Sequence, residues 1–153
     1  MTPEEKLKSL GISLTPAPKP LGSYVPAVRA GNMIYLSGIL PLRDGKLVRT
    51  GKVGQDITID EAREEAKAVV INALSILREY AGGLDNVKRC VKVNGYISSA
   101  PDFTEQPKVL NAASDFLFEI FGEAGRHARA AIGVAVLPLN SPVEIDFVFE
   151  LKG

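Results

Sequence analysis

The chain has 153 residues, 46% of them hydrophobic, and is long enough to form one ordinary domain with a sizeable core. Its 18 basic and 18 acidic residues give a formal net charge of zero without a long basic run, which disfavours tight nonspecific binding to nucleic acid. A single cysteine, Cys90, excludes an internal disulfide, no Cys/His cluster has metal-ligand spacing, and neither a signal peptide nor a membrane span is evident, so we expect a soluble, cytoplasmic protein without a metal.

The N-terminal segment, residues 1–20, predicts a short helix followed by an extended connector. Thr2 provides an N-cap, Glu5 completes a capping box, and Gly11 ends the helix. Three prolines then prevent the chain from continuing as a helix. We therefore divide the chain into this N-terminal segment and a main domain, residues 21–153.

Strands and helices alternate through the middle of the chain. The strands Tyr24–Arg29 and Met33–Ser37 are joined by a turn that contains glycine and asparagine, which predicts a hairpin. Apolar residues recur every three or four positions from Asp60 to Ala81 and from Thr104 to Phe121, and each stretch ends at a glycine, which predicts two amphipathic helices. Between them, Val87 to Ile97 alternates as a strand does, and we expect it beside the first hairpin.

The last segment, from Gly125 to Leu151, predicts two strands joined as an antiparallel hairpin. Apolar and small residues alternate in the first strand, and apolar and acidic residues alternate in the second. If these strands pair, the parity of the pattern places Ile132 in the core and Arg129 on a face of small residues. The same register puts Glu150 opposite Arg129 and Glu144 opposite Ala135.

This order of elements predicts an α+β fold in which both helices cover one face of a single sheet. The second face would carry small residues and a few charges. We therefore expect a closed homo-oligomer, with a C₃ arrangement among the candidates, that packs these faces together. Ligand sites would then lie in clefts between subunits.

Arg129 is the principal candidate for ligand binding. Small residues beside a single guanidinium leave space for a small anion, and a planar guanidinium binds a carboxylate in bidentate fashion. The alternative is an ordinary cross-strand ion pair with Glu150. His127, the only histidine, also has two interpretations: a general base with a near-neutral pKa, or an exposed or capping residue in the loop before the strand.

Several short segments, taken in order, resemble the YjgF/RidA family, also called the L-PSP endoribonuclease family. They are Gly22-Ser23-Tyr24-Val25, Gly31 to Gly38, Asn111, Ala128-Arg129, Leu137-Pro138 and Val143-Glu144-Ile145. The resemblance covers roughly residues 20–152 and implies a chorismate-mutase-like mixed sheet, a homotrimer and three intersubunit clefts. Family members with known activity hydrolyse reactive enamine or imine intermediates to 2-oxo acids and ammonia, without a cofactor.

The resemblance also implies roles for individual residues. Arg129 would hold the substrate carboxylate, Glu144 would hold or activate water, and Tyr24, Ser37, Gly38, Asn111 and Ala131 would line the same cleft. The sequence departs from the better-studied branch at Ala131, where a cysteine is usual, and at Ile39, where a glutamine is usual. Each position also has a structural alternative: an interface or edge charge for Glu144, a sheet-covering aromatic for Tyr24, an ordinary strand end for Ser37-Gly38 and a helix-surface residue for Asn111.

Three functions follow from these observations and stay open. The first is hydrolysis of 2-imino acids, an enamine or imine deaminase activity. The second is noncatalytic binding of small carboxylate metabolites. The third is the L-PSP-type endoribonuclease activity, which the neutral net charge disfavours.

Overall fold

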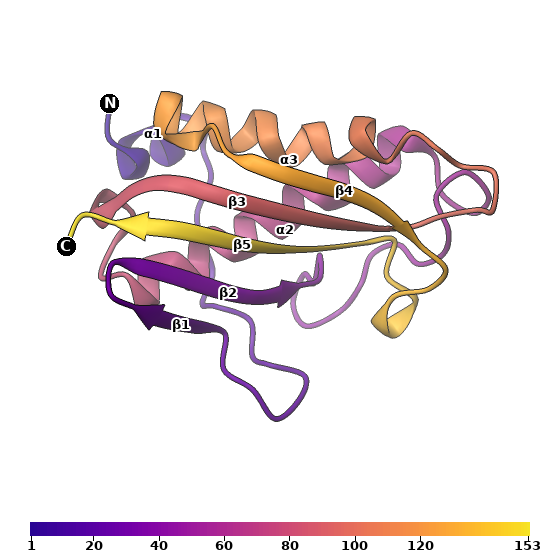
Figure 1. Ribbon diagram of the computed structural model, residues 1–153, viewed down its shortest axis with the longest axis horizontal. Coiled ribbons are helices and arrows are strands. Elements are labelled where there is room, and N and C mark those ends of the chain that lie inside the picture. The colour runs from indigo at the N-terminus through magenta and orange to yellow at the C-terminus, as the bar shows by residue number, and fades with distance from the viewer.

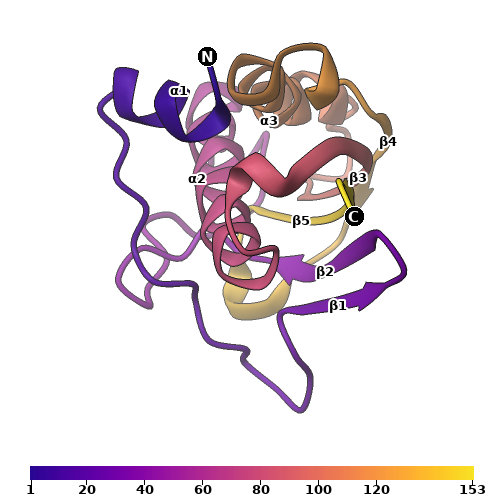
Figure 2. The ribbon, with the colours of Figure 1, turned by 90° about the vertical axis from the view of Figure 1, so that its left-hand side faces the viewer.

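A five-stranded mixed sheet, in the order β1-β2-β5-β3-β4, organises the computed structural model, which describes residues 1–153 (Figure 1). The strands are β1 Ala27–Ala30, β2 Met33–Ile39, β3 Val87–Ser98, β4 Ala128–Val134 and β5 Val143–Leu151. The helices are α1 Pro3–Ser9, α2 Ile59–Tyr80 and α3 Gln106–Phe121, with short 3₁₀ turns η1 Leu84–Asn86, η2 Gly122–Gly125 and η3 Pro138–Asn140. Helices α2 and α3 lie side by side over one face of the sheet (Figure 2), which confirms the predicted fold class.

The helices begin and end close to where their sequence signals place them. Thr2 and Thr58 each accept a hydrogen bond from the backbone three residues later, and the glutamate at that position reaches back, so α1 and α2 both begin with a capping box. Leu7 of α1 is buried in the main core, which fixes the N-terminal helix to the rest of the molecule. None of the helices combines the length and the hydropathy needed to cross a bilayer.

The predicted C-terminal hairpin is wrong, because β4 and β5 both form but do not pair with each other. β4 pairs in parallel with β3, since α3 carries the chain back between these two strands. β5 then returns between β2 and β3 and runs antiparallel to both (Figure 1). For the same reason β3 does not lie beside the first hairpin, because β5 occupies that position.

The parallel pairing of β4 reverses the face on which Arg129 was expected. Arg129 is aligned with Val93, which is fully buried under the helices, so its side chain lies on the α3 side of the sheet. Ile132 is consequently on the open face and is 48% exposed, not in the core. Glu150 is aligned with Met33 of β2 and is not opposite Arg129, so the predicted ion pair between them is absent.

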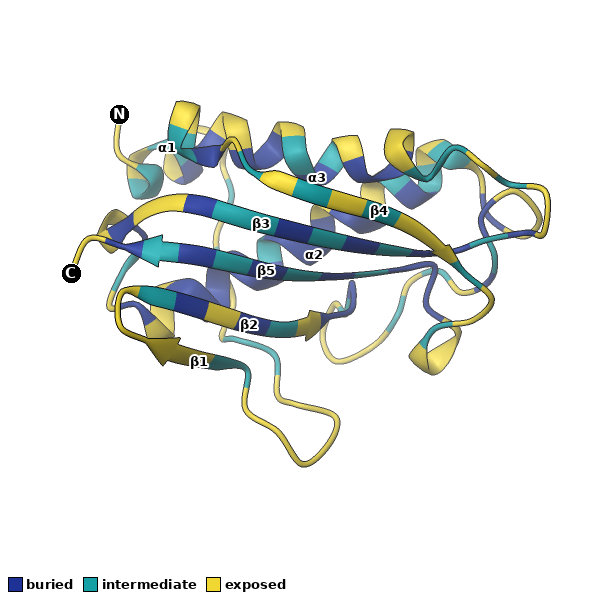
Figure 3. Cartoon of the chain, viewed as in Figure 1, coloured by how far each residue is buried: buried dark blue, intermediate teal, exposed yellow.

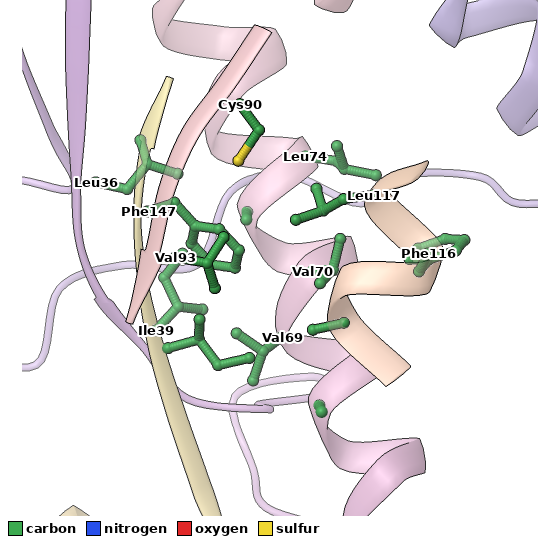
Figure 4. Close-up of a cluster of buried hydrophobic side chains, with 14 of the residues drawn as sticks. Leu36, Ile39, Val69, Val70, Leu74, Cys90, Val93, Phe116, Leu117 and Phe147 are labelled. Carbon is green, nitrogen blue, oxygen red and sulfur yellow. The ribbon is translucent and has the colours of Figure 1, made fainter. Parts of the chain in front are cut away.

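The core lies between the sheet and the two long helices. Val93 of β3 and Phe147 of β5 point toward the buried side chains of α2 and α3 (Figure 4). Alternate residues of β5, from Val143 to Leu151, are buried beneath the helices because β5 is a central strand with a neighbour on each side. The acidic residues between them, including Glu144, therefore face the open side of the sheet.

The open face of the sheet carries no helix, and its edges are the most exposed strands (Figure 3). Val28, Tyr35 and Ile132 lie on this face with exposed fractions of 55%, 47% and 48%. Such large apolar side chains usually gather at contact surfaces when several share one face.

Candidate functional site

A pocket of about 290 Å³, which we call the Glu144 pocket, opens at the end of β2. Four residues singled out from the sequence line it: Tyr24, Ser37, Gly38 and Glu144. The prolines of the connector form its outer wall, together with Lys19, and apolar residues from β2 and α2 form its floor. Four residues chosen from the sequence therefore lie together in one concave pocket whose lining is mostly apolar.

A β-bulge in β2 shapes this pocket. Leu36 is aligned with Phe147 and Ile39 with Ile145, so three steps along β2 correspond to two along β5. The extra residue falls in Ser37-Gly38, where the ladder is interrupted. Ser37 is fixed at the bulge because its hydroxyl donates to the carbonyl of Val25 at 2.6 Å.

Gly38 leaves the space that the Glu144 carboxylate occupies. A Cβ at position 38 would lie 2.6 Å from Glu144 Oε2, closer than two nonbonded atoms tolerate. Gly38 does not have a positive φ, so the backbone itself would accept another residue. A side chain at position 38 would therefore displace the Glu144 carboxylate from the place that it occupies, without straining the backbone.

The surroundings of Glu144 raise its pKa above the usual range of a glutamate. Burial disfavours the charged form, and the neighbouring Asp146 carboxylate adds repulsion. Asp146 is itself held in place, because its two oxygens accept hydrogen bonds from Asn94 Nδ2 and Tyr96 Oη, each at 2.9 Å. A raised pKa makes this carboxyl a stronger proton acceptor than an ordinary glutamate.

Tyr24 lines the Glu144 pocket beside the connector residues Pro18 to Leu21. Its hydroxyl accepts a hydrogen bond from the backbone N–H of Leu21 at 3.3 Å, and its side chain is 48% exposed. The phenol therefore borders the pocket and does not cover the sheet. The hydroxyl also has a proton to donate to a ligand.

A second, shallower pocket lies between α3 and the start of β4, and we call it the Arg129 pocket. Asn111, Ser114, Asp115 and Phe118 contribute from one side of α3, since they are spaced three or four residues apart along it. Arg126, His127 and Arg129 contribute from the chain that enters β4. Two further residues singled out from the sequence, Asn111 and Arg129, therefore share this pocket.

Arg129 is anchored without a carboxylate partner. One terminal nitrogen donates to Ser114 Oγ at 3.0 Å, and the other donates to the carbonyl of Pro107 at 3.3 Å. No acidic side chain forms a salt bridge with it, although eight such pairs occur elsewhere in the chain. The Nε–H and one N–H of each terminal nitrogen have no protein partner, so a positioned guanidinium is available to an anion.

His127 is half-buried and bonded at both ring nitrogens. Nδ1 lies 2.7 Å from the carbonyl oxygen of Gly125, which only accepts, so Nδ1 carries the proton of the neutral ring. Nε2 then accepts from Ser114 Oγ at 2.9 Å. Burial lowers the pKa of His127, the nearby charge of Arg129 lowers it further, and the bond to Gly125 opposes both.

Glu144 and Arg129 lie on opposite faces of the sheet, although the Glu144 pocket itself extends past the end of β2 to Ile76 of α2. Glu144 is on the open face of the central strand β5, whereas Arg129 is on the helix side of the edge strand β4. The two side chains therefore stay apart within one chain. Ala131 packs against the core and lines neither pocket.

Sequence reasoning gave no role to Ser114, which lines the Arg129 pocket, or to Asp146, which raises the pKa of Glu144 without lining either pocket. Ser114 lies three residues after Asn111, and this helical spacing was the signal that would have found it. Asp146 lies two residues after Glu144, on the same face of the strand. Both were visible as patterns, but neither belongs to the segments that carried the family resemblance.

Metal or thiol chemistry has no support in the arrangement of side chains. No group of three or more histidine, cysteine or acidic residues is placed to hold a metal ion. Burial raises the pKa of the Cys90 thiol to about 12, which keeps it protonated.

Comparison with known proteins gives a consistent result along the whole chain. Residues 4–151 match a family described as "YjgF/chorismate mutase-like, putative endoribonuclease". The chain is 43% identical over 147 residues to Protein TCP17 of Trypanosoma cruzi, covering 95% of this chain and 92% of that protein. It is 34% identical over 141 residues to a 2-iminobutanoate/2-iminopropanoate deaminase of Dermatophagoides farinae, covering 92% and 95% respectively.

A solved structure extends this likeness to three dimensions. A protein from Shewanella oneidensis, described as a putative endoribonuclease, superposes with a TM-score of 0.95 at 36% identity and covers 99% of this chain and 100% of that one. The match includes the N-terminal helix and connector, because almost no residue of this chain is left outside it.

Proposed function

Because this chain belongs to the YjgF/chorismate-mutase-like family, we propose that it hydrolyses small 2-imino acids, or their enamine tautomers, to 2-oxo acids and ammonia. The observation that carries the proposal is a guanidinium, Arg129, that is positioned by two hydrogen bonds and has no carboxylate partner. A relative named as a 2-iminobutanoate/2-iminopropanoate deaminase supports the substrate class.

The reaction makes modest demands that these residues can meet. Arg129 holds the substrate carboxylate and so fixes the imine carbon in place. Water attacks the carbon of the protonated imine, the C=N electron pair moves to nitrogen, and Glu144 takes the proton that the water releases. Glu144 then returns this proton to the carbinolamine nitrogen, the C–N bond breaks to release ammonia, and the carbinol hydroxyl gives its proton to solvent as the C=O bond of the 2-oxo acid forms. A carboxyl with a raised pKa suits both steps.

Both residues can act on one ligand only if a second copy of the chain completes the site. Arg129 and Glu144 lie on opposite faces of the sheet, so one copy would supply the cation and its neighbour the acid. The exposed apolar residues Val28, Tyr35 and Ile132 on the open face support a cyclic oligomer that packs these faces together, and we propose a trimer.

Binding of small carboxylates without turnover is the second candidate. The Arg129 pocket on a single chain already contains a positioned cation, Asn111 and Ser114, and these need no contribution from Glu144 to bind an anion. The ribonuclease interpretation has weaker support, because the net charge is zero and the chain has no long basic run.

Ammonia release from freshly generated 2-aminoacrylate tests the proposal. We expect the purified protein to accelerate the release and Arg129→Ala to abolish the gain, while the control Arg29→Ala, which removes an exposed arginine of the β1–β2 hairpin that lines neither pocket, keeps it. A thermal-shift screen with 2-oxo acids separates the two candidates, since stabilisation without turnover indicates a binder. No acceleration with several amino-acid-derived imines would overturn the deaminase proposal.

A further inference from the structure

A continuous chain of hydrogen bonds runs from the backbone to the free arginine. His127 donates from Nδ1–H to the Gly125 carbonyl, and its Nε2 accepts a hydrogen bond from the Ser114 hydroxyl. Ser114 Oγ in turn accepts a hydrogen bond from an N–H of Arg129. The three distances are 2.7, 2.9 and 3.0 Å. The proposed hydrolysis uses only the last member of this chain and leaves Ser114 and His127 without a role.

We propose that Ser114 and His127 are positioning residues for the carboxylate anchor, and that proton uptake by His127 frees the Ser114 hydroxyl to donate to the bound carboxylate. This inference rests on the proposed role of Arg129 and deepens it. It assigns a two-donor anion site, a guanidinium and a hydroxyl, whose second donor is controlled by the single histidine of the chain.

When His127 is neutral, the Ser114 hydroxyl donates its hydrogen bond to His127. Nε2 has no proton, so Ser114 must donate to it, and the lone pairs of Oγ remain for Arg129. The guanidinium is then held against α3 by Ser114 and the Pro107 carbonyl. A ligand carboxylate would meet Arg129 alone.

Protonation of His127 reverses the direction of the hydrogen bond between its Nε2 and Ser114 Oγ. Both ring nitrogens become donors, so Ser114 Oγ accepts from Nε2 as well as from Arg129, and its own proton becomes available. The hydroxyl can then donate to a carboxylate bound at Arg129, and the imidazolium adds a second positive charge beside it. Anion binding and proton uptake at His127 therefore strengthen each other.

The charged groups around His127 are nearly balanced without a ligand. Arg129 and Arg126 share the pocket with it, and Arg89 of β3 lies on its other side. The negative groups are Asp115 of α3, Glu150 of β5 and Glu123, which is paired with Arg126 at 3.2 Å. A carboxylate bound at Arg129 would add one negative charge and so favour the protonated, imidazolium form of His127.

Nuclear magnetic resonance of the one histidine tests the inference directly, with pyruvate as the anion. Without ligand, we expect the Nδ1–H tautomer at neutral pH. Saturating pyruvate should raise the pKa of His127 by about half a unit or more, equivalent to at least about a threefold gain in affinity between high and low pH. An Nε2–H tautomer, or a His127 pKa that pyruvate leaves unchanged, would overturn the inference.

Two variants at position 114 complete the test. Ser114→Ala should weaken pyruvate binding at low pH about threefold to tenfold and raise KM while kcat stays near its original value; Ser114→Thr, which keeps a hydroxyl, should restore most of both. If pyruvate binds through Arg129 and Ser114→Ala changes nothing, this inference fails and the proposed function stands. If Arg129→Ala leaves pyruvate binding unchanged, or wild type does not bind it, the anchor itself fails.

Discussion

The Glu144 pocket and the Arg129 pocket differ in almost every respect. The first is walled by apolar segments and contains a carboxyl whose pKa is raised by burial and by Asp146. The second is a shallow, polar depression that contains a guanidinium with no acidic partner. One offers proton transfer and enclosure, and the other offers anion binding.

This difference teaches that neither pocket is a complete site for an imino acid. An acid alone does not position a substrate, and a cation alone does not move a proton. Because Glu144 and Arg129 lie on opposite faces of the sheet, the proposed hydrolysis requires a neighbouring copy to bring them together. The following predictions separate the two contributions, from the largest expected effect to the smallest.

Removing the cation should have the largest effect. We expect Arg129→Ala to lower kcat/KM at least about a hundredfold, because two charge-assisted hydrogen bonds to the substrate carboxylate are lost. Arg129→Lys should recover little, since an ammonium cannot replace a bidentate fork. Steady-state kinetics measure both, and full activity in either variant would show that Arg129 does not anchor the substrate.

Adding one methyl group at Gly38 should damage the other pocket. The new Cβ would lie 2.6 Å from Glu144 Oε2 and force the carboxylate away, so we expect Gly38→Ala to lower kcat about tenfold to a hundredfold. The melting temperature should change little, because φ at Gly38 is not positive. Partial recovery in Gly38→Ala combined with Glu144→Asp, compared with Gly38→Ala alone, would identify the clash as the cause.

The smallest effect concerns stability and pH. The pKa of Glu144 is raised in the folded state, so the folded protein binds this proton more tightly than the unfolded chain and loses stability as pH rises through that pKa. Glu144→Gln should therefore raise the melting temperature by about 1–2 °C at pH 8 and leave it nearly unchanged at pH 4. A lower melting temperature at pH 8 would contradict the raised pKa.

The elements of the fold could be predicted from local patterns, but their pairing could not. Capping boxes and apolar periodicity predicted α1 and α2, and alternation predicted β3 and β5. The hairpin prediction failed because β4 prefers the neighbour that α3 connects to it, and β5 enters the centre of the sheet instead. Adjacency along the chain carries no information about such a crossover.

The same limit explains what could be predicted of the site. The residue pattern led to Arg129 and the family resemblance led to Glu144, and the structure places each in a pocket with other residues chosen from the sequence. The face of the sheet on which Arg129 lies depended on the pairing of β4. The alternative interpretation, an ion pair between Arg129 and Glu150, was therefore wrong. The bulge at Ser37-Gly38 depends on how β2 meets β5, which no local pattern contains.

Complementation between two inactive variants tests most directly whether neighbouring copies complete each other. Arg129→Ala and Glu144→Ala chains are coexpressed in equal amounts, and the mixed oligomers are assayed on an imino acid that the wild-type protein hydrolyses. Random assembly in a ring gives each cleft a one-in-four chance of intact Arg129 from one chain and intact Glu144 from its neighbour, so we predict about a quarter of wild-type activity. A mixture no more active than the separate variants would contradict the account.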